Sequence, residues 1–156
     1  PPNQHEHNMP AIIQQLFGTS EKRTENNGVG RETMFENALS HLKSANKKLF
    51  DKKRLRTDCI EAMQAFPFLI PTTETLGQGK GTVLKLEGKV YMFYKTAQYV
   101  VPVKVLVDSE YPRTWPKCQI RITEDLEIPP HHHRVDVSGD VYLTCLTKES
   151  WNHKKS

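Results

Sequence analysis

The chain has 156 residues and a net charge of +4, with 37 % hydrophobic and 26 % charged side chains, which fits one polar domain with an added tail or helix. No apolar run approaches the roughly 18 residues of a membrane span, so stable membrane insertion is not expected. No basic and apolar signal opens the chain, so secretion is not expected either. Three cysteines at wide spacing argue against a disulfide framework and for a reducing, cytoplasmic compartment.

Residues 1–30 are rich in Asn, Gln, Glu, Pro and Gly. They cannot bury enough apolar surface to offset the entropy of ordering, so we expect a mostly mobile N-terminal tail. Within it, the stretch PAIIQQLFG at residues 10–18 has the spacing of one or two amphipathic turns. Such a segment can dock on the domain or on a partner, or remain mobile.

Two helices follow the tail. Over residues 31–49, apolar side chains recur at steps of three and four, at Phe35, Ala38, Leu42, Ala45 and Leu49. This spacing is typical of one apolar helix face. A second helix is predicted from about Lys52 to the FPFLIP segment, where Pro67 and Pro71 disfavour helix in the residues before them.

Much of the positive charge lies around the junction of these helices, on Lys47, Lys48, Lys52, Lys53, Arg54 and Arg56. A cluster of this kind can contact acidic lipid headgroups or nucleic acid, or it can be a solvated helix face. Aromatic side chains do not interleave with it as a single-strand binder requires, so no nucleic-acid partner is predicted.

The hydrophobic period then changes to two. The segments TVLKLE, VYMF, QYVVPVKVLV and CQIRI, between residues 82 and 122, read as short strands separated by turns. The glycine-rich LGQGKG at residues 76–81 lacks the ending of a phosphate loop and precedes a strand, which predicts a hairpin turn. Pro102 predicts an edge or bulge position. Helices followed by an antiparallel meander indicate the α+β class.

Two segments carry side chains that can support metal binding or catalysis. His131, His132 and His133 are imidazoles, but consecutive residues do not converge on one ion and fit no zinc spacing, so neither a metal nor another cofactor is predicted. Cys145 lies in an alternating segment with Leu143 two residues before it, which is typical of a packing cysteine. His133 and Lys148 are near enough in sequence to leave a working thiol open.

The segment LEGKVYMFYKTAQYVVPVKVLVDSEYPRTWPKCQIRI, followed by VDVSGDVYLTCL, resembles the ubiquitin-conjugating enzyme fold. That family carries a Y-P-x-x-P-P turn, a His-Pro-Asn triplet and a G-x-x-C-L motif with the nucleophilic cysteine. Here the last motif reads Gly139-Asp140-Val141-Tyr142-Leu143, so Tyr142 stands in the thiol position, and the triplet is absent. A phenol with a pKa near 10 is poorly suited to thioester exchange. The chain is therefore similar to the ubiquitin-conjugating enzyme variants (UEV domains), which keep the fold and lack the activity.

Within the variants, the spacing resembles the branch of the tumour-susceptibility protein in the first ESCRT complex, which sorts ubiquitinated cargo at endosomes. Its pattern L-x-G-x-I/V-x-V-x-Y-x4-Y-x2-P is met by Leu86, Gly88, Val90, Met92, Tyr94, Tyr99 and Pro102. The resemblance implies a cytoplasmic, endosome-associated adaptor with other ESCRT subunits as partners. Two alternatives remain: an inactive partner subunit of an active conjugating enzyme, or a conjugating enzyme that uses Cys145.

The resemblance also implies two binding sites. In this branch, paired tyrosines line a groove for Pro-Thr/Ser-Ala-Pro peptides, and the matching residues are Tyr94 and Tyr99, with Pro102 and Lys89 beside them. Aromatic rings suit a proline-rich ligand because they offer flat apolar platforms. Ubiquitin binding falls on positions that are Gly77, Gln78, Leu106 and Gln119 in this chain. Leu106 and Gln119 replace aromatic residues there, which weakens the apolar part of that contact.

The resemblance predicts the overall architecture as well: N-terminal helices packed on a four-stranded antiparallel meander. The predicted UEV-like domain covers residues 31–156, with the helix at 31–49 as an additional N-terminal element. The family continues beyond the position of Trp151 with further helices that complete the groove. We expect these C-terminal helices to be missing from the 156 residues.

Overall fold

The computed structural model describes residues 21–46, 48–94, 96–147 and 150–151. Two helices come first, α2 at Glu21–Asn46 and α3 at Lys52–Ala65. Four strands follow, β1 at Ile70–Thr75, β2 at Thr82–Tyr94, β3 at Ala97–Val107 and β4 at Lys117–Ile120. A short 3-10 helix, η1, spans Thr144–Leu146. No helix among the described residues is long and apolar enough to cross a membrane.

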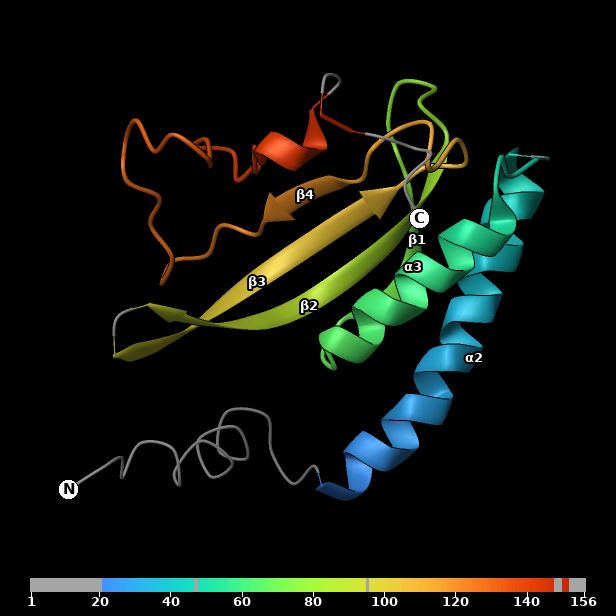
Figure 1. The fold of residues 1–156 in the computed structure, drawn as a ribbon, viewed down its shortest axis with the longest axis horizontal. Helices are drawn as coiled ribbons and strands as arrows, with labels where there is room; N and C mark the ends of the chain where they lie inside the picture. Colours follow the sequence, from blue (N-terminus) through green and yellow to red (C-terminus); the bar gives the residue numbers. More distant parts are fainter. Residues whose placement is uncertain (1–20, 47, 95, 148–149, 152–156) are drawn as a thin grey trace.

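The strands form one antiparallel sheet in the order β1-β2-β3-β4. The two helices lie along one face of this sheet (Figure 1). We call that side the helix face and the opposite side the outer face. The α+β class, with N-terminal helices on a four-stranded antiparallel meander, is therefore confirmed.

The core lies between the helix face and the two helices. It contains side chains that are almost fully buried from both helices and from the sheet, among them Phe35, Leu39, Leu42, Leu55, Met63, Leu84 and Leu86. The period of three and four in α2 places Phe35, Leu39 and Leu42 on one helix stripe, which is why they can all face the sheet. Leu84 and Leu86 are two apart in β2 and therefore share its helix face.

Helix bounds differ in part from the sequence pattern. α2 begins at Glu21, so residues 21–30, which we assigned to the tail, are helical, and it ends at Asn46 rather than residue 49. α3 begins at Lys52 as predicted, because the Asp51 carboxylate accepts the Arg54 N–H at 3.0 Å and caps it. The PAIIQQLFG segment lies outside the described residues.

The junction between α3 and β1 is held by Arg31 of α2. Its guanidinium donates to the carbonyl oxygens of Met63 at 2.7 Å, Leu69 at 3.0 Å and Phe66 at 3.3 Å. The Met63 and Phe66 carbonyls belong to the last turn of α3 and its cap, where helix carbonyls lack intrahelical partners. Phe66 is the C-terminal cap residue of α3, and its side chain is exposed.

Strand β2 is longer than the sequence pattern indicates, because TVLKLE and VYMF form one continuous strand through Gly88. A Cβ at Gly88 would collide with the carbonyl oxygen of Phe68, so this close approach requires glycine. The LGQGKG segment is the β1–β2 turn as predicted, closed by the Leu76 N–H donating to the Gly81 carbonyl at 2.8 Å.

Candidate functional site

Tyr142 lies in a loop that follows the sheet and is organised by one carboxylate. The Asp136 carboxylate accepts the Ser138 hydroxyl at 2.5 Å, the Ser138 N–H at 2.9 Å, the Tyr142 hydroxyl at 2.9 Å and the Asp140 N–H at 3.0 Å. The Tyr142 N–H donates to the Arg134 carbonyl at 2.6 Å. Tyr142 is thus held in place at both its backbone and its hydroxyl.

Gly139 makes this loop fit against the sheet. Its φ of 92° lies in the left-handed region, and a Cβ there would collide with the Ile120 carbonyl oxygen. The Ile120 N–H in turn donates to the Gly139 carbonyl at 2.7 Å. The glycine of the G-x-x-Y motif therefore docks the loop on β4 three residues before Tyr142.

The hydrogen bonds of the loop shift the pKa values of both Asp136 and Tyr142. Donation from the Ser138 hydroxyl lowers the pKa of Asp136, with further bonds from Tyr142 and from backbone N–H groups acting in the same direction. Donation to Asp136 raises the pKa of Tyr142 above 10. The Tyr142 phenol therefore stays protonated at neutral pH, which disfavours it as a nucleophile.

A cavity of about 430 Å³ lies beside Tyr142, lined by Trp115, Pro116, Cys118 and Leu143 among others. Trp115 and Pro116 belong to the segment YPRTWP at residues 111–116, in which the Tyr111–Pro112 peptide bond is cis. Cys145 is exposed on η1 and does not line this cavity. Burial raises the pKa of the Cys118 thiol, with Cys145 nearby as the second cause.

The β2–β3 hairpin extends well beyond β4, which pairs with β3 only from Val103 to Leu106. The Pro102 carbonyl accepts the Arg121 N–H at 2.9 Å, so the backbone of Pro102 faces the side of β4 at the point where β4 ends. Gln98 and Val100 face the same side because they precede Pro102 by four and two residues. Within the described part of the chain, no strand continues β4 beside them. Pro102 thus lies where β4 ends, and the open part of β3 comprises the residues before it.

A groove of about 590 Å³ lies along this open part of β3. Its lining residues are Lys89, Val100, Pro102, Arg121, Ile122, Thr123, Glu124 and Asp125. The groove therefore contains Lys89 and Pro102 of the predicted peptide-binding residues, which also face each other as a cross-strand pair. The sequence did not mark residues 121–125 as groove residues. Arg121 and Ile122 end the predicted strand CQIRI, and residues 123–125 directly follow it.

Tyr94 and Tyr99 occupy the other face of the same hairpin. Tyr99 pairs with Met92, and the backbone register places Tyr94 two residues after Met92, so both positions lie on the helix face. Tyr99 is half exposed there, and the side chain of Tyr94 lies outside the described atoms. The four predicted peptide-binding residues are therefore close in the ladder but divided between its two faces.

Two of the predicted ubiquitin-binding positions, Leu106 and Gln119, differ in exposure. Leu106 and Gln119 both lie on the outer face, where Leu106 pairs with Lys85 and Gln119 with Lys104. Leu106 is buried, whereas Gln119 is partly exposed and donates through Nε2 to Asp140 at 2.6 Å. The sequence alone offered no sign that Leu106 would be covered.

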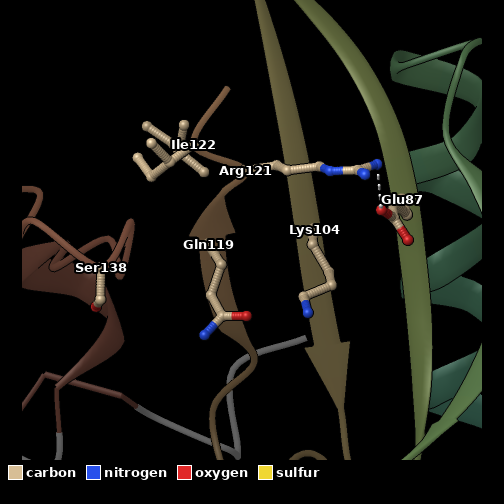
Figure 2. Close-up of a pocket in the computed structure, with 7 residues that line it drawn as sticks. Glu87, Lys104, Gln119, Arg121, Ile122 and Ser138 are labelled. Carbon is tan, nitrogen blue, oxygen red and sulfur yellow. Dashed lines mark ion pairs between the residues drawn. The ribbon is translucent and has the colours of Figure 1, made fainter. Parts of the chain in front are cut away.

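Gln119 lines a depression of about 280 Å³ on the outer face. Figure 2 shows Gln119, Lys104 and Glu87 on three neighbouring strands, with the Arg121 side chain extended across β3 toward Glu87. The Arg121 and Glu87 charges are 3.8 Å apart, and Lys85 also pairs with Glu87 at 3.1 Å. The surface around Gln119 is accordingly charged rather than apolar.

Gly77 and Gln78 form the exposed tip of the β1–β2 turn. Gln78 has a φ of 61°, a left-handed conformation that a side chain disfavours. The turn joins Thr75 of β1 to Thr82 of β2, which are partners in the sheet. Thr82 precedes Lys85, the partner of Leu106, by three residues. The tip therefore lies at the same end of the sheet as Leu106.

The three consecutive histidines form a small loop structure of their own. His132 accepts the N–H groups of Arg134 and Val135 on Nδ1, at 3.2 Å and 3.1 Å, and its ring stacks on that of His133. These two hydrogen bonds to Nδ1 position Arg134 and Val135, the two residues before Asp136. No group of three or more metal-ligating side chains occurs among the described residues.

The UEV domain family model matches residues 41–156. The chain belongs to the UEV domain family. Members of this family generally lack catalytic activity. The family match begins within α2, so much of that helix precedes it.

Two curated relatives resemble this UEV domain at 28 % identity. They are the ESCRT-I complex subunit tsg101 of Dictyostelium discoideum, over 102 residues, and the ubiquitin-conjugating enzyme E2 variant 3 of Danio rerio, over 118 residues. The matches cover 65 % and 70 % of this chain. They span only 21 % and 24 % of the relatives, so this UEV domain corresponds to a minor part of each.

Two solved structures share the fold of this UEV domain. One is the yeast vps23 UEV domain in complex with a vps27 PSDP peptide, with a TM-score of 0.60 at 21 % identity, covering 78 % of this chain and 83 % of that one. The other is a complex of the Vps23 UEV with ubiquitin, with a TM-score of 0.56 at 22 % identity, covering 78 % and 84 %. At this identity the likeness shows the fold.

Proposed function

We propose that this UEV domain is a catalytically inactive adaptor that binds Pro-Thr/Ser-Ala-Pro-type peptides, and ubiquitin, during ESCRT-dependent sorting of endosomal cargo. Its place of action is then the cytoplasmic side of endosomes, with other ESCRT subunits as partners. The observation that carries the proposal is the groove along the open part of β3. The thiol position held by Tyr142 supports the inactive part of the proposal.

The groove suits an extended proline-rich segment for two reasons. Backbone groups of Gln98 and Val100 face it without a neighbouring strand, so a peptide can hydrogen-bond to the edge of β3 as an added strand would. Val100, Pro102 and Ile122 supply apolar contacts, while Thr123 and charged side chains surround them. A polyproline segment loses little conformational entropy on binding because it is already extended.

Support for this ligand class also comes from the relatives. The yeast vps23 UEV domain was solved with a proline-containing PSDP peptide, and the Vps23 UEV was solved with ubiquitin. We infer that the same two classes of ligand bind this chain. The Tyr99 ring, exposed on the other face of the hairpin, is the proposed aromatic contact at the end of the peptide.

Titration of isotope-labelled protein with a Pro-Thr-Ala-Pro peptide tests the groove. We expect amide shifts at Val100 and at residues 121–125, and none with a peptide in which alanine replaces both prolines. Ile122→Asp should weaken binding by about tenfold, which corresponds to about 1.4 kcal/mol. Met34→Asp is the matched control, because Met34 on α2 is 40 % exposed and Ile122 is 43 % exposed. An unshifted groove would refute the peptide site.

Ubiquitin binding is tested separately with unlabelled ubiquitin. We expect shifts at Gly77, Gln78 and Gln119, and a weaker complex for Lys104→Glu, since Lys104 lines the depression beside Gln119. Shifts confined to other surfaces would show that ubiquitin uses a different face. Because the two titrations follow different residues, one site can be refuted without the other.

Inactivity is tested by incubating the chain with ubiquitin-activating enzyme, ubiquitin and ATP. We expect no adduct that a thiol reductant removes, because Tyr142 holds the thiol position and Cys145 lies outside the adjoining cavity. A reducible adduct that disappears in Cys145→Ser would instead establish the chain as a conjugating enzyme.

A further inference from the structure

Three connections meet at one end of the molecule. They are the α2–α3 connection at residues 48–51, the β1–β2 turn at residues 76–81 and the segment after β3 at residues 108–113 (Figure 1). The Phe50 N–H donates to the Ser109 carbonyl at 2.8 Å, and the Asn46 side chain donates to the Thr82 carbonyl at 3.0 Å. These bonds place the three connections side by side.

Exposed lysines collect on this surface. They are Lys43 in the last turn of α2, Lys48 in the connection, Lys52 and Lys53 at the start of α3, and Lys80 in the β1–β2 turn. None of them is in an ion pair within the part of the chain that the structure describes. We call this surface the lysine end.

The acidic side chains nearby have other partners. Asp51 caps α3 through the Arg54 N–H, Asp108 accepts the Thr114 hydroxyl at 2.6 Å, and Glu110 pairs with Arg113 at 3.6 Å. The lysine end therefore keeps an excess of positive charge at its surface. On the outer face, by contrast, Lys85, Lys104 and Arg121 are all paired with glutamates.

An aromatic side chain lies among these lysines. Phe50 is 39 % exposed, and the Arg113 guanidinium lies 3.9 Å from its ring centroid. The sequence reasoning overlooked it when it judged that no aromatic interleaves with the basic cluster. Exposed aromatic and cationic side chains together are typical of surfaces that meet the headgroup region of a bilayer.

We propose that the lysine end docks on membranes that contain anionic lipids. Lysine ammonium groups act as point charges that suit a diffuse anionic surface, whereas base recognition favours arginine forks and stacked rings. The surface is built from three connections rather than from a groove, which fits a membrane plane better than a nucleic-acid strand. The proposal is independent of the peptide groove, which lies on the open part of β3.

Docking would also occupy the β1–β2 turn, because Lys80 belongs to it together with Gly77 and Gln78. If the proposed ubiquitin site is correct, anionic membranes and ubiquitin compete for this turn. The lipid experiment below does not use ubiquitin, so failure of the ubiquitin proposal leaves its outcome unchanged.

Vesicle co-sedimentation of the full chain tests the proposal. The probes are vesicles of phosphatidylcholine alone and vesicles with about one third phosphatidylserine, at low and high salt. We expect binding only to the anionic vesicles, and release at high salt because screening weakens charge attraction. The triple variant Lys48→Gln, Lys52→Gln and Lys53→Gln should bind on the order of a hundredfold more weakly, since each cation near the surface contributes about fivefold.

A matched control removes as much charge from the far part of the outer face and from the loop after β4: Lys89→Gln, Arg121→Gln and Arg134→Gln, at positions away from the lysine end. We expect it to retain most binding, with circular dichroism verifying that both triple variants are folded. Phe50→Ala should weaken binding by a further few-fold through lost apolar contact. Equal loss in both triple variants, binding to phosphatidylcholine alone, or tighter binding to single-stranded RNA at the same salt would overturn the proposal.

Discussion

The helix-covered half of the molecule and the loop region at residues 118–147 are held together by different forces. In the first, Phe35, Leu42 and Leu84 are fully buried between the helices and the sheet. In the second, the partly exposed Asp136 carboxylate accepts hydrogen bonds from a hydroxyl, a phenol and two backbone N–H groups. The thiol position and the part of the groove formed by residues 121–125 lie in this second region, where apolar burial contributes little.

This contrast separates stability from recognition. Burial of apolar side chains dominates the free energy of folding, so the helix-covered half sets whether the chain folds. The loop region sets which groups are presented at the groove and beside Tyr142, because polar bonds with specific geometry define its conformation. Substitutions in the helix-covered half should therefore have large effects on the free energy of unfolding. Substitutions in the loop region should have smaller effects on it and should mainly change the local conformation.

The largest effect is expected from Phe35→Ala, which empties a fully buried position between α2 and the sheet. Loss of burial together with the remaining cavity should reduce the free energy of unfolding by about 3–5 kcal/mol. Urea denaturation followed by circular dichroism measures it. The neighbouring Met34→Ala, at an exposed position, is the control, and an equal loss there would contradict a core centred on Phe35.

Gly88→Ala should have the next largest effect, because the added Cβ meets the Phe68 carbonyl oxygen in the middle of β2. Forcing the two backbones apart should lower the free energy of unfolding by about 1–3 kcal/mol. Gly77→Ala provides the comparison, since nothing lies within 4 Å of a Cβ at that position. Equal stability of both variants in the same urea series would argue against the close approach of the two segments.

Tyr111→Phe removes a buried hydroxyl that donates to Asp58 at 2.5 Å. The partner carboxylate is itself partly exposed, so the expected loss in free energy of unfolding is about 1–2 kcal/mol. The effect lies within the helix-covered half, because Asp58 belongs to α3. It can be measured by thermal or urea unfolding at neutral pH.

The same substitution has a signature in pH. Burial, and then the hydrogen bond to Asp58, raises the pKa of Tyr111 above 10, and burial raises the pKa of Cys59 from 9.0 to about 12. Groups with raised pKa values stabilise the fold below their unfolded-state pKa, and this contribution is lost as pH rises. Wild-type stability should thus fall above about pH 9, and Tyr111→Phe should fall less steeply above pH 10. Parallel curves would contradict this assignment.

Asp136→Asn should have the smallest effect on global stability and the most localised one. The Ser138 and Asp140 N–H groups lose a charged acceptor, so their hydrogen exchange should accelerate while the core amides stay unchanged. The pKa of Asp136 is lowered, whereas that of Tyr111 is raised, so the two groups change stability in opposite directions of pH. The stabilisation from Asp136 is present above its ordinary pKa of 3.8 and is lost as pH falls. Ser138→Ala should reproduce part of the change, and unaltered exchange in both variants would remove Asp136 as the organiser of the loop.

Much of the fold could be predicted because its periodicity is strong. The period of α2 identified Phe35, Ala38 and Leu42 as buried, and the alternation in TVLKLE identified the strand side of Leu84 and Leu86. The strand β1 was not assigned, since IPTTET contains a proline and only one other apolar residue. Its place in the sheet depends on pairing with β2, which no local pattern encodes.

The candidate site could be predicted only in part, for a similar reason. Tyr142 could be identified from a sequence motif. Its hydrogen bond to Asp136 joins residues only six apart in the chain, so this part of the site is local. The groove depends on β4 ending at Ile120, and strand ends follow from long-range pairing rather than local preference. Leu106 and Lys104 lie two apart on the same face, yet only the tertiary packing determines that Leu106 is buried.

The unequal lengths of β3 and β4 leave the far part of the β2–β3 hairpin as a two-stranded arm, rooted where Gly88 meets Phe68. The direction of that arm is therefore dictated by a contact between main chains at its base. Substitutions at residues 66–69, remote from any docked ligand, should tilt the arm and alter the width of the groove. A selection of variants that bind a ligand more tightly should therefore return substitutions at residues 66–69 as well as in the groove.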